Sequence, residues 1–355
     1  MTLPSPLFPK KLNKQNYPFI FSILFIVLIF LFVLNLSLGS VAIPISEIWT
    51  IIFQKTASKS SWVTIIWEFR LPKALTAVIV GMALSVSGLQ MQTLFRNPLA
   101  GPFVLGISSG ASLGVAILML FVSGLSANSF LNSILSQNSL WQTSIASTLG
   151  AAIVLSLVIV ASIRISNNMA LLIIGLMFGS ATGAIVSILQ YFSEAEAIKS
   201  YLLWTFGSLS QVTWDKLPFL FILNFIGLFI VWAMHKPLDA LLLGERYAQS
   251  MGLSLQKTRL GIIFTTSILA GSITAFCGPI GFIGLAVPHL TKILIKTARH
   301  QILIPAVALA GAILLLICDS ISQLPMSSKV LPINAVTALI GAPVVIWVIL
   351  KKRSL

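Results

Sequence analysis

The sequence predicts an all-α integral membrane protein with ten transmembrane helices. Hydrophobic residues make up 57% of the 355 residues and charged residues only 8%, and the mean hydropathy is +1.02. A soluble domain carries roughly a quarter charged residues, so this composition excludes an ordinary soluble fold. Because one span needs ~20 apolar residues, the length allows about ten spans in a single polytopic domain over residues 1–355.

Ten apolar runs follow one another along the chain. They cover residues 18–38, 72–94, 102–124, 141–163, 169–191, 215–234, 259–276, 282–297, 303–321 and 331–350. Lys10, Lys11 and Lys14 precede the first run, as basic residues precede the core of a signal peptide. The first run is longer than the ~7–15 residues of such a core, so we predict that it is retained as the first span.

The seventh and eighth runs are short, and the sequence GPIGFIG (278–284) lies between them. Lipid cannot hydrogen-bond the backbone groups of a broken or short helix at membrane depth. We therefore expect this break to be buried in protein or to line a cavity.

The charged residues divide unequally between the two ends of the predicted spans. If both termini are cytoplasmic, fifteen basic and two acidic residues lie inside, and seven basic and six acidic residues lie outside. The inside residues are Lys10, Lys11, Lys14, Arg96, Arg164, Lys236, Arg246, Lys257, Arg259, Lys292, Lys296, Arg299, Lys351, Lys352 and Arg353, with Asp239 and Glu245. This asymmetry follows the positive-inside rule. It explains the net charge of +14 by a lipid membrane, so we expect no nucleic-acid partner.

A polar segment at Pro237 to Arg259 interrupts the apolar sequence and lies on the predicted cytoplasmic side. It resembles two short amphipathic helices hinged at Gly244 and lying outside the bilayer. Glu245 suits the positive end of the second helix, and Gly252 suits a left-handed position after its end. The spacing predicts one shared face for Tyr247, Ala248 and Met251. A solvated loop with a frayed helix fits the spacing equally well.

Two series of glycines recur at four-residue spacing, the spacing that lets membrane helices approach closely. The series are Gly106, Gly110 and Gly114, and Gly175, Gly179 and Gly183. They could serve packing within one chain or an interface between subunits, and the spacing does not separate the two. We also expect the second series to line part of a transport path.

Four stretches, in order, resemble one family of permeases. They are RLPKALTAVIVGMALSVSGLQMQTLFRNPLAGPFVLGISSGASLG (70–114), LLLGERYAQSMG (241–252), GPIGFIGLAVPHLTKIL (278–294) and LPINAVTALIGAPVVIWVIL (331–350). The chain is similar in these stretches to permeases of the FecCD type, which serve iron-siderophore, haem and vitamin B12 import. The resemblance implies a type II ABC importer of the bacterial cytoplasmic membrane. Its parts would be two ten-helix permeases, two cytoplasmic ATPase subunits and an extracytoplasmic binding protein.

The resemblance also assigns roles to individual residues. The phosphate loop GxxxxGK[ST] does not occur in this sequence, so ATP hydrolysis is expected on a separate chain and this chain is expected not to be an enzyme. The residues that match the family's ATPase-coupling pattern are Leu243, Gly244, Glu245, Ala248 and Gly252. The resemblance thus implies a cytoplasmic coupling segment at residues 237–259, and we use this name for it below.

On the opposite side, the resemblance implies that Arg70 and Lys73 pair with glutamates of the binding protein. A simpler interpretation is anchoring at the membrane interface by snorkelling side chains. Gln323 stands where vitamin B12 relatives carry a further arginine, and Lys329 is the nearby residue that could replace it.

We expect neither a metal nor a cofactor. Cys277 and Cys318 lie in apolar runs and suit buried structural thiols. His289 suits capping or packing better than ligation, since His235 and His300 offer no partner at ligand spacing. An intramembrane enzyme therefore has no support.

An ion-coupled secondary transporter would need ionisable residues at membrane depth. Asp319 is the only carboxylate well inside an apolar run, and it is predicted near the outer end. The expected function is therefore ATP-driven import by alternating access, with no covalent chemistry in this chain. The expected cargo is a ferric siderophore, with haem and cobalamin open, and a homodimer of permeases is preferred to a pair of related permeases.

Overall fold

The computed structural model describes residues 16–122, 139–165, 167–323 and 329–352. Lys10, Lys11, Lys14, Arg353 and the last two residues of the run 102–124 lie outside the described residues. Each of the ten predicted runs coincides with a helical segment. The single-helix spans are α1 (Asn16–Ser37), α4 (Leu71–Phe95), α7 (Ser139–Arg164), α8 (Asn168–Tyr191), α10 (Leu217–Ala233), α13 (Leu255–Cys277), α14 (Ile283–Ile295), α15 (His300–Ser322) and α16 (Ile333–Lys352). The third run is built from η2 (Pro102–Leu105), α5 (Ile107–Ala116) and η3 (Ile117–Val122).

Within the described residues, six helices are long and apolar enough to cross a membrane by themselves. A seventh candidate is the pair of α10 and α11 (His235–Leu243), which is bent by 51°. Three shorter apolar helices cover Ile107–Leu120, Ile283–Ile295 and Ile333–Trp347. These segments together match the all-α, ten-helix membrane fold that the sequence predicts.

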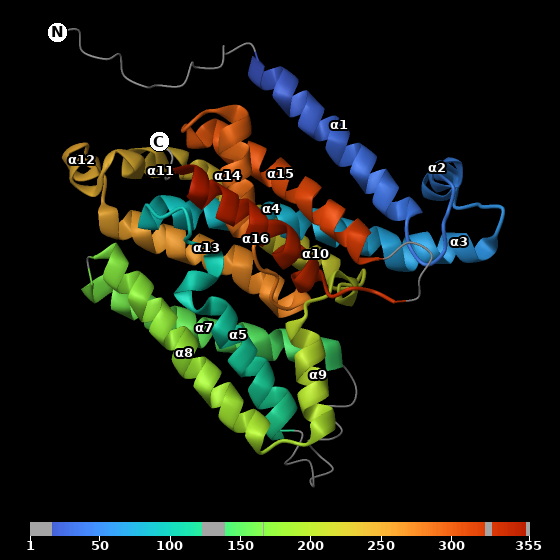
Figure 1. Cartoon of the computed structure of the whole chain (residues 1–355), viewed down its shortest axis with the longest axis horizontal. Coiled ribbons are helices and arrows are strands. Elements are labelled where there is room, and N and C mark those ends of the chain that lie inside the picture. The colour runs from blue at the N-terminus through green and yellow to red at the C-terminus, as the bar shows by residue number, and fades with distance from the viewer. Residues whose placement is uncertain (1–15, 123–138, 166, 324–328, 353–355) are drawn as a thin grey trace.

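Shorter helices lie at the two ends of the long axis (Figure 1). At one end are α2 (Ile45–Gln54), α3 (Ser60–Thr64) and η1 (Ile65–Arg70); at the other are α11 and α12 (Glu245–Ser250). Two further elements, α9 (Ala195–Thr205) and η4 (Leu209–Gln211), connect α8 to α10. Most of the polar segment predicted outside the bilayer thus forms two short helices at one end of the bundle.

Helix α4 runs through the middle of the molecule, and its side chains are almost all buried. Two of its glycines touch the backbone of neighbouring helices. A Cβ atom on Gly81 would lie 2.4 Å from the carbonyl oxygen of Gly311 in α15, and one on Gly88 would lie 1.9 Å from that of Gly284 in α14. Glycine is therefore required at these crossings, because any side chain would separate the helices.

The glycine series named from the sequence pack mainly within this chain. A Cβ atom on Gly110 would lie 2.6 Å from the carbonyl oxygen of Gly150 in α7. One on Gly175 in α8 would lie 2.5 Å from that of Val104, and one on Gly106 would lie 3.0 Å from that of Gly175. These glycines therefore join α7 and α8 to the η2–α5 segment.

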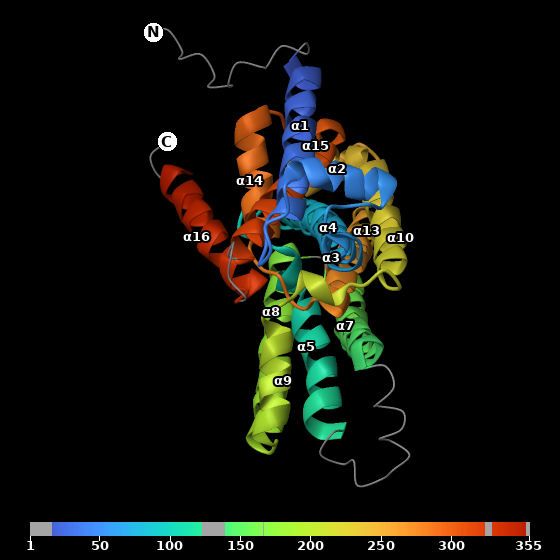
Figure 2. The ribbon, with the colours of Figure 1, turned by 90° about the vertical axis from the view of Figure 1, so that its right-hand side faces the viewer.

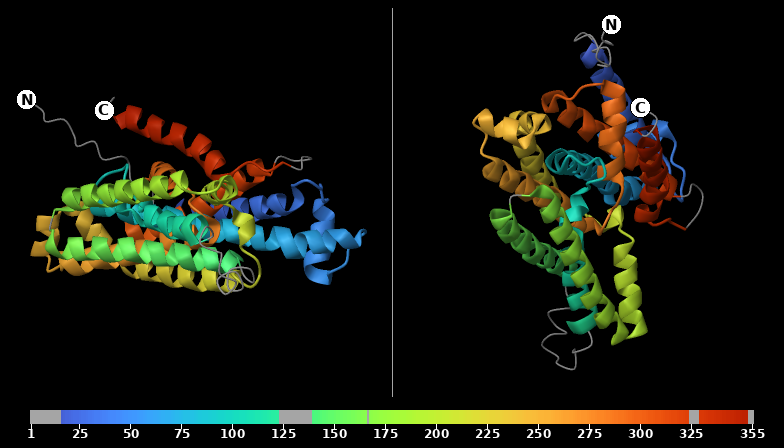
Figure 3. Two further views of the ribbon diagram at one scale, coloured as in Figure 1. Left: turned by 90° about the horizontal axis from the view of Figure 1, so that it is seen from below. Right: turned by 60° about the vertical axis from the view of Figure 1, so that its left-hand side comes forward.

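The two remaining glycines of the second series are less crowded. A Cβ atom on Gly179 would meet the hydroxyl of Ser109 at 3.3 Å, and one on Gly183 would meet no described atom within 4 Å. Helix α16 lies at the periphery of the bundle (Figures 2 and 3).

The break between α13 and α14 is buried, as the membrane constraint requires. Ser208 donates its backbone N–H to the carbonyl of Cys277 (2.7 Å), and Gly281 donates its own to the Asn334 side chain (2.9 Å).

The expectation of two short helices is wrong for the first of them. Helix α13 has 23 residues because it begins at Leu255, among polar residues that the apolar run does not include, whereas α14 has only 13.

We predict that Gly88→Ala destabilises the protein, because its methyl group would overlap the Gly284 backbone. Overpacking of this kind costs roughly 1–3 kcal/mol or more. The matched control is Gly271→Ala in buried α13, where the nearest atom would be Cγ2 of Ile107 at an ordinary 3.7 Å. Thermal unfolding of the purified proteins in detergent measures the difference. Equal melting temperatures for the two variants would contradict this account of the crossing.

Candidate functional site: polar clusters at the two ends of α4

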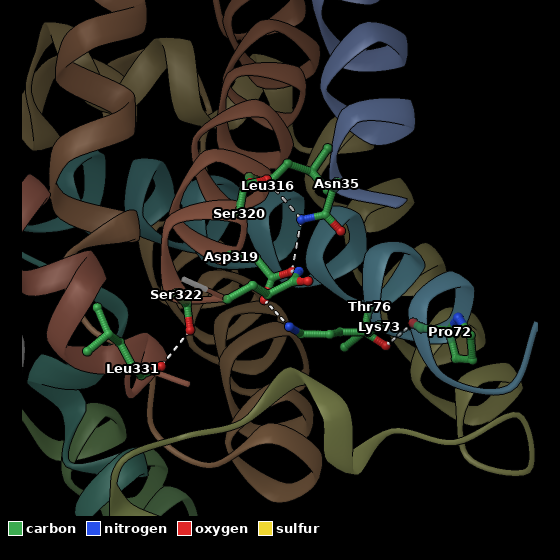
Figure 4. A network of polar contacts seen from close by, with 10 residues as sticks. Asn35, Pro72, Lys73, Thr76, Leu316, Asp319, Ser320, Ser322 and Leu331 are labelled. Carbon is green, nitrogen blue, oxygen red and sulfur yellow. Dashed lines mark hydrogen bonds and ion pairs between the residues drawn. The ribbon is translucent and has the colours of Figure 1, made fainter. Parts of the chain in front are cut away.

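A buried carboxylate gathers three helices near the start of α4 (Figure 4). Asp319 of α15 accepts hydrogen bonds from Lys73 of α4 and Asn35 of α1, each at 2.9 Å. Gln323 donates to the same carboxylate, also at 2.9 Å. Asp319 is 1% exposed, and these donors satisfy both of its oxygens. Gln323 therefore has a structural role here.

Arg70 faces the protein interior and is 7% exposed. Its guanidinium donates to the carbonyls of Leu36 (2.7 Å), Ser37 (3.0 Å) and Val41. These carbonyls lie at and just after the end of α1, where a helix leaves acceptors unpaired and favours a cation. Anchoring by a snorkelling side chain is therefore wrong for Arg70, since the charged end points inward.

A pocket of about 500 Å³ opens at this end of the molecule. Its polar and charged lining residues include Glu68, Arg70, Lys73, Ser210, Thr213 and Gln323. Lys329 is exposed. Arg70 and Lys73 thus share one pocket, and both also have partners within the chain. Their pairing with a binding protein stays a prediction.

The polar segment at the other end has the predicted two-helix form. Gly244 separates α11 from α12 at a φ of +123°, and Gly252 follows α12 at a φ of +84°. Both are values that glycine adopts without strain. Four large apolar side chains of this segment are exposed: Leu242, Leu243, Tyr247 and Met251. We call these four residues the exposed apolar face of the coupling segment.

Ala248 does not share that face. It is fully buried, whereas Tyr247 and Met251 are 55% and 62% exposed. The prediction of one face for all three residues is therefore wrong. The helix is only six residues long and packs one side against the protein, so Ala248, next to Tyr247 in sequence, points inward. The coupling role of Ala248 would be packing, not contact with a partner.

The coupling segment also contacts the transmembrane helices through polar groups. Glu245 accepts a hydrogen bond from Asn168 at the start of α8. Asp239 of α11 pairs with His300 at the start of α15, with 2.7 Å between carboxylate oxygen and Nδ1. The sequence alone does not predict this pair. The two residues are 61 positions apart, and no spacing rule connects them.

The remaining histidine and cysteine candidates have structural surroundings. His289 bonds the carbonyl of Pro98 through Nε2 at 2.9 Å, which agrees with a packing role. Cys277 and Cys318 are buried free thiols. Within the described residues, no group of three or more His, Cys, Asp or Glu side chains is arranged to hold a metal ion.

We predict that Asp319→Ala strongly destabilises the protein. Removing one partner of a buried ion pair costs about 3–5 kcal/mol. The loss should lie at the lower end of that range, because Lys73 keeps part of its side chain exposed (14%) while Asn35 and Gln323 lose their acceptor. The control is Lys199→Ala, which breaks the exposed pair of Lys199 and Glu196 and should cost at most about 1 kcal/mol. Unfolding of both variants in detergent gives the comparison. Similar losses of stability would show that the Asp319 cluster is not a structural centre.

Comparisons with known proteins agree on the family. The sequence profile of the FecCD transport family matches residues 27–351. The chain is 36% identical over 294 residues to a vitamin B12 import system permease protein of Photorhabdus laumondii, covering 81% of this chain and 82% of the relative. It is 33% identical over 332 residues to a hemin transport system permease protein of Yersinia pestis, covering 93% and 95% of the two chains.

A solved structure has the same architecture. It is described as an inward-facing conformation of a metal-chelate type ABC transporter. It superposes with a TM-score of 0.81 at 30% identity, and the match covers 94% of this chain and all of the solved chain. The family match, the two permease relatives and the shared fold lead to one conclusion: this chain is a multi-pass membrane permease that belongs to the FecCD transport family.

Proposed function

We propose that this chain is the permease subunit of an ATP-driven importer that carries an iron chelate, a ferric siderophore, across the bacterial cytoplasmic membrane. Both termini would be cytoplasmic, in agreement with the charge asymmetry of the sequence. The observation that carries the proposal is the coupling segment. It presents an exposed apolar face outside the transmembrane helices and is also attached to several of them.

The exposed apolar face supports docking of a cytoplasmic ATPase. Leu242, Leu243 and Tyr247 belong to two short helices at one end of the bundle, and Met251 directly follows the second. Several large apolar side chains exposed so close together in sequence support an interaction site, and a short helix that lays an apolar face into a groove is a common recognition mode. Hydrolysis of ATP would occur on that partner, since this sequence has no phosphate loop.

The pocket at the other end supports docking of an extracytoplasmic binding protein. Lys73 borders the pocket and keeps part of its side chain exposed (14%) while it pairs with Asp319. A carboxylate of the binding protein could add a second partner to this cation. Arg70 would help to shape the pocket and would not pair with a carboxylate, because its charged end is already bonded to backbone carbonyls.

Transport would proceed by alternating access in a homodimer of permeases. Gly183 of α8 supports a transport path beside this helix. It borders an open pocket of about 210 Å³ together with Ser108, Ser109, Ser112 and Tyr201. These side chains are neutral, and their hydroxyl groups form hydrogen bonds that are individually weak. Such a surface suits a bulky polar chelate that must pass without being held.

A second candidate cargo has specific support. Relatives that cover most of this chain are named as permeases for vitamin B12 and hemin. The structural relative is described as a metal-chelate type transporter, which agrees with all three cargoes. A haem or cobalamin permease is therefore the alternative to the siderophore permease.

We predict that replacing residues 245–251 by a flexible glycine–serine linker abolishes co-purification of the ATPase. The finer variant is Tyr247→Ser with Met251→Ser, which should weaken the complex because it removes two apolar contacts. Phe53→Ser is the matched control, since Phe53 is 75% exposed on α2 at the opposite end. Equal co-purification for all variants would contradict the assignment of the docking surface.

The cargo is tested by reconstituting this permease in liposomes with the ATPase and binding protein encoded beside it. A ferric hydroxamate siderophore, haem and cobalamin are offered separately. We expect ATP hydrolysis and uptake to rise with the siderophore. A response to haem or cobalamin instead would transfer the proposal to that cargo. The absence of any ATPase complex, with uptake driven by a proton or sodium gradient, would refute the importer.

A further inference from the structure

A chain of polar contacts joins the coupling segment to the cytoplasmic ends of two central helices; it is buried at His300 and Thr93 and partly exposed at Asp239. One carboxylate oxygen of Asp239 in α11 accepts hydrogen bonds from Nδ1 of His300 (2.7 Å) and from the backbone N–H of the same residue (2.8 Å). On the other edge of the imidazole, Nε2 of His300 lies 3.0 Å from the hydroxyl of Thr93 near the end of α4, and the same hydroxyl lies 2.9 Å from the carbonyl of Leu89 one turn earlier in α4. The contacts thus run from α11 through the first residue of α15 to α4.

The donors and acceptors in the contacts of Asp239 follow from the chemistry of the groups. An ionised carboxylate only accepts hydrogen bonds, so Nδ1 of His300 carries a proton and donates to Asp239. The same carboxylate accepts a backbone N–H at the start of α15, where a helix has unpaired donors and favours a negative charge. Asp239 therefore binds both the side chain and the end of the helix. A rotation of α11 would move the start of α15 with it.

Burial makes this arrangement unusual for a residue at a helix end. His300 is 1% exposed and Thr93 is 2% exposed, so water does not compete for the bond between them, whereas the Asp239 side chain is 38% exposed. Apolar contacts between helices allow sliding, whereas hydrogen bonds of defined geometry fix the relative position of the two elements. The three residues join the coupling segment to α15 and α4 by such bonds.

A second contact joins the same helices. Arg96, one turn beyond Thr93, donates through Nε and Nη2 to the carbonyl of Leu241 in α11, at 3.2 and 2.8 Å. The hinge glycine is adapted to it, since a Cβ atom on Gly244 would lie 3.2 Å from Nη2 of Arg96. Helix α4 is therefore attached to α11 both through His300 and directly.

We propose that Asp239, His300 and Thr93 are positioning residues that transmit movement of the coupling segment to α15 and α4. This rests on the proposed function, because the movement would come from a docked ATPase. The role is distinct from docking itself, since His300 and Thr93 are buried and lie behind the exposed apolar face. Loss of the link should leave the partner bound and separate ATP hydrolysis from transport.

The test uses the complete transporter in liposomes and measures cargo taken up per ATP hydrolysed. The probe is whichever of the ferric hydroxamate siderophore, haem or cobalamin the wild-type transporter takes up. Thr93→Val removes the hydroxyl but keeps the shape of the side chain, and Thr93→Ser keeps the hydroxyl. We expect Thr93→Val to retain ATPase binding and hydrolysis but to lose about five-fold or more in uptake per ATP, the lower range of coupling between distant sites. Thr93→Ser should restore the ratio.

His300→Gln provides a second variant of the same link, and Thr274→Val provides the control. Thr274 is also buried, and its hydroxyl bonds the carbonyl of Ala270 in its own helix (2.9 Å), as that of Thr93 bonds Leu89. Within the described residues it makes no bond to another helix, so its removal should leave the ratio unchanged. Uptake per ATP at the wild-type value in both Thr93→Val and His300→Gln would overturn the inference. Failure of the wild-type permease to bind any ATPase would instead refute the proposed function, so the two failures are distinguishable.

Discussion

The close contact of α4 with the backbones of α14 and α15 is the constraint on which the remaining structure depends. In a bilayer, burying an apolar side chain against another helix gains little over leaving it in lipid, so helices associate by close packing and polar contacts. The glycines at 81, 88, 284 and 311 allow that packing, and their backbones nearly touch. Helix α4 is thereby enclosed by other helices instead of lipid, and it can carry polar side chains along its length.

Because α4 is enclosed, it joins the two ends of the protein at which the candidate functional sites lie. Its 25 residues extend over roughly 38 Å at about 1.5 Å per residue. Lys73 near its start belongs to the Asp319 cluster, and Thr93 near its end belongs to the Asp239–His300 contacts. Helix α15 takes part in both clusters, with His300 at its start and Asp319 close to its end. A pair of packed helices therefore connects the outer pocket to the coupling segment, and neither cluster requires a flexible connection.

The candidate site was predictable in kind but not in detail. The positions of the coupling segment and its hinge follow from local rules, since a polar stretch between apolar runs and a glycine between two short helices are visible in the sequence. The inward orientation of Ala248, the bonding of Arg70 to the carbonyls at the end of α1, and the pairing of Asp239 with His300 depend on which helices lie beside each residue. Periodicity reports that a residue avoids lipid, but it does not identify the neighbour that covers it.

The sequence by itself determined the all-helical membrane fold and the ten apolar segments. The hydrophobicity of a span is a local requirement of the bilayer, and each run therefore predicts its helix independently of the others. The lengths of α13 and of the short α14 were decided by the tertiary structure, because polar residues extend the first and a buried break limits the second. The polar clusters were decided there as well. Asn35 and Asp319 are 284 residues apart. Only the packing of α1 against α15 brings the Asn35 amide within hydrogen-bond distance of the buried Asp319 carboxylate.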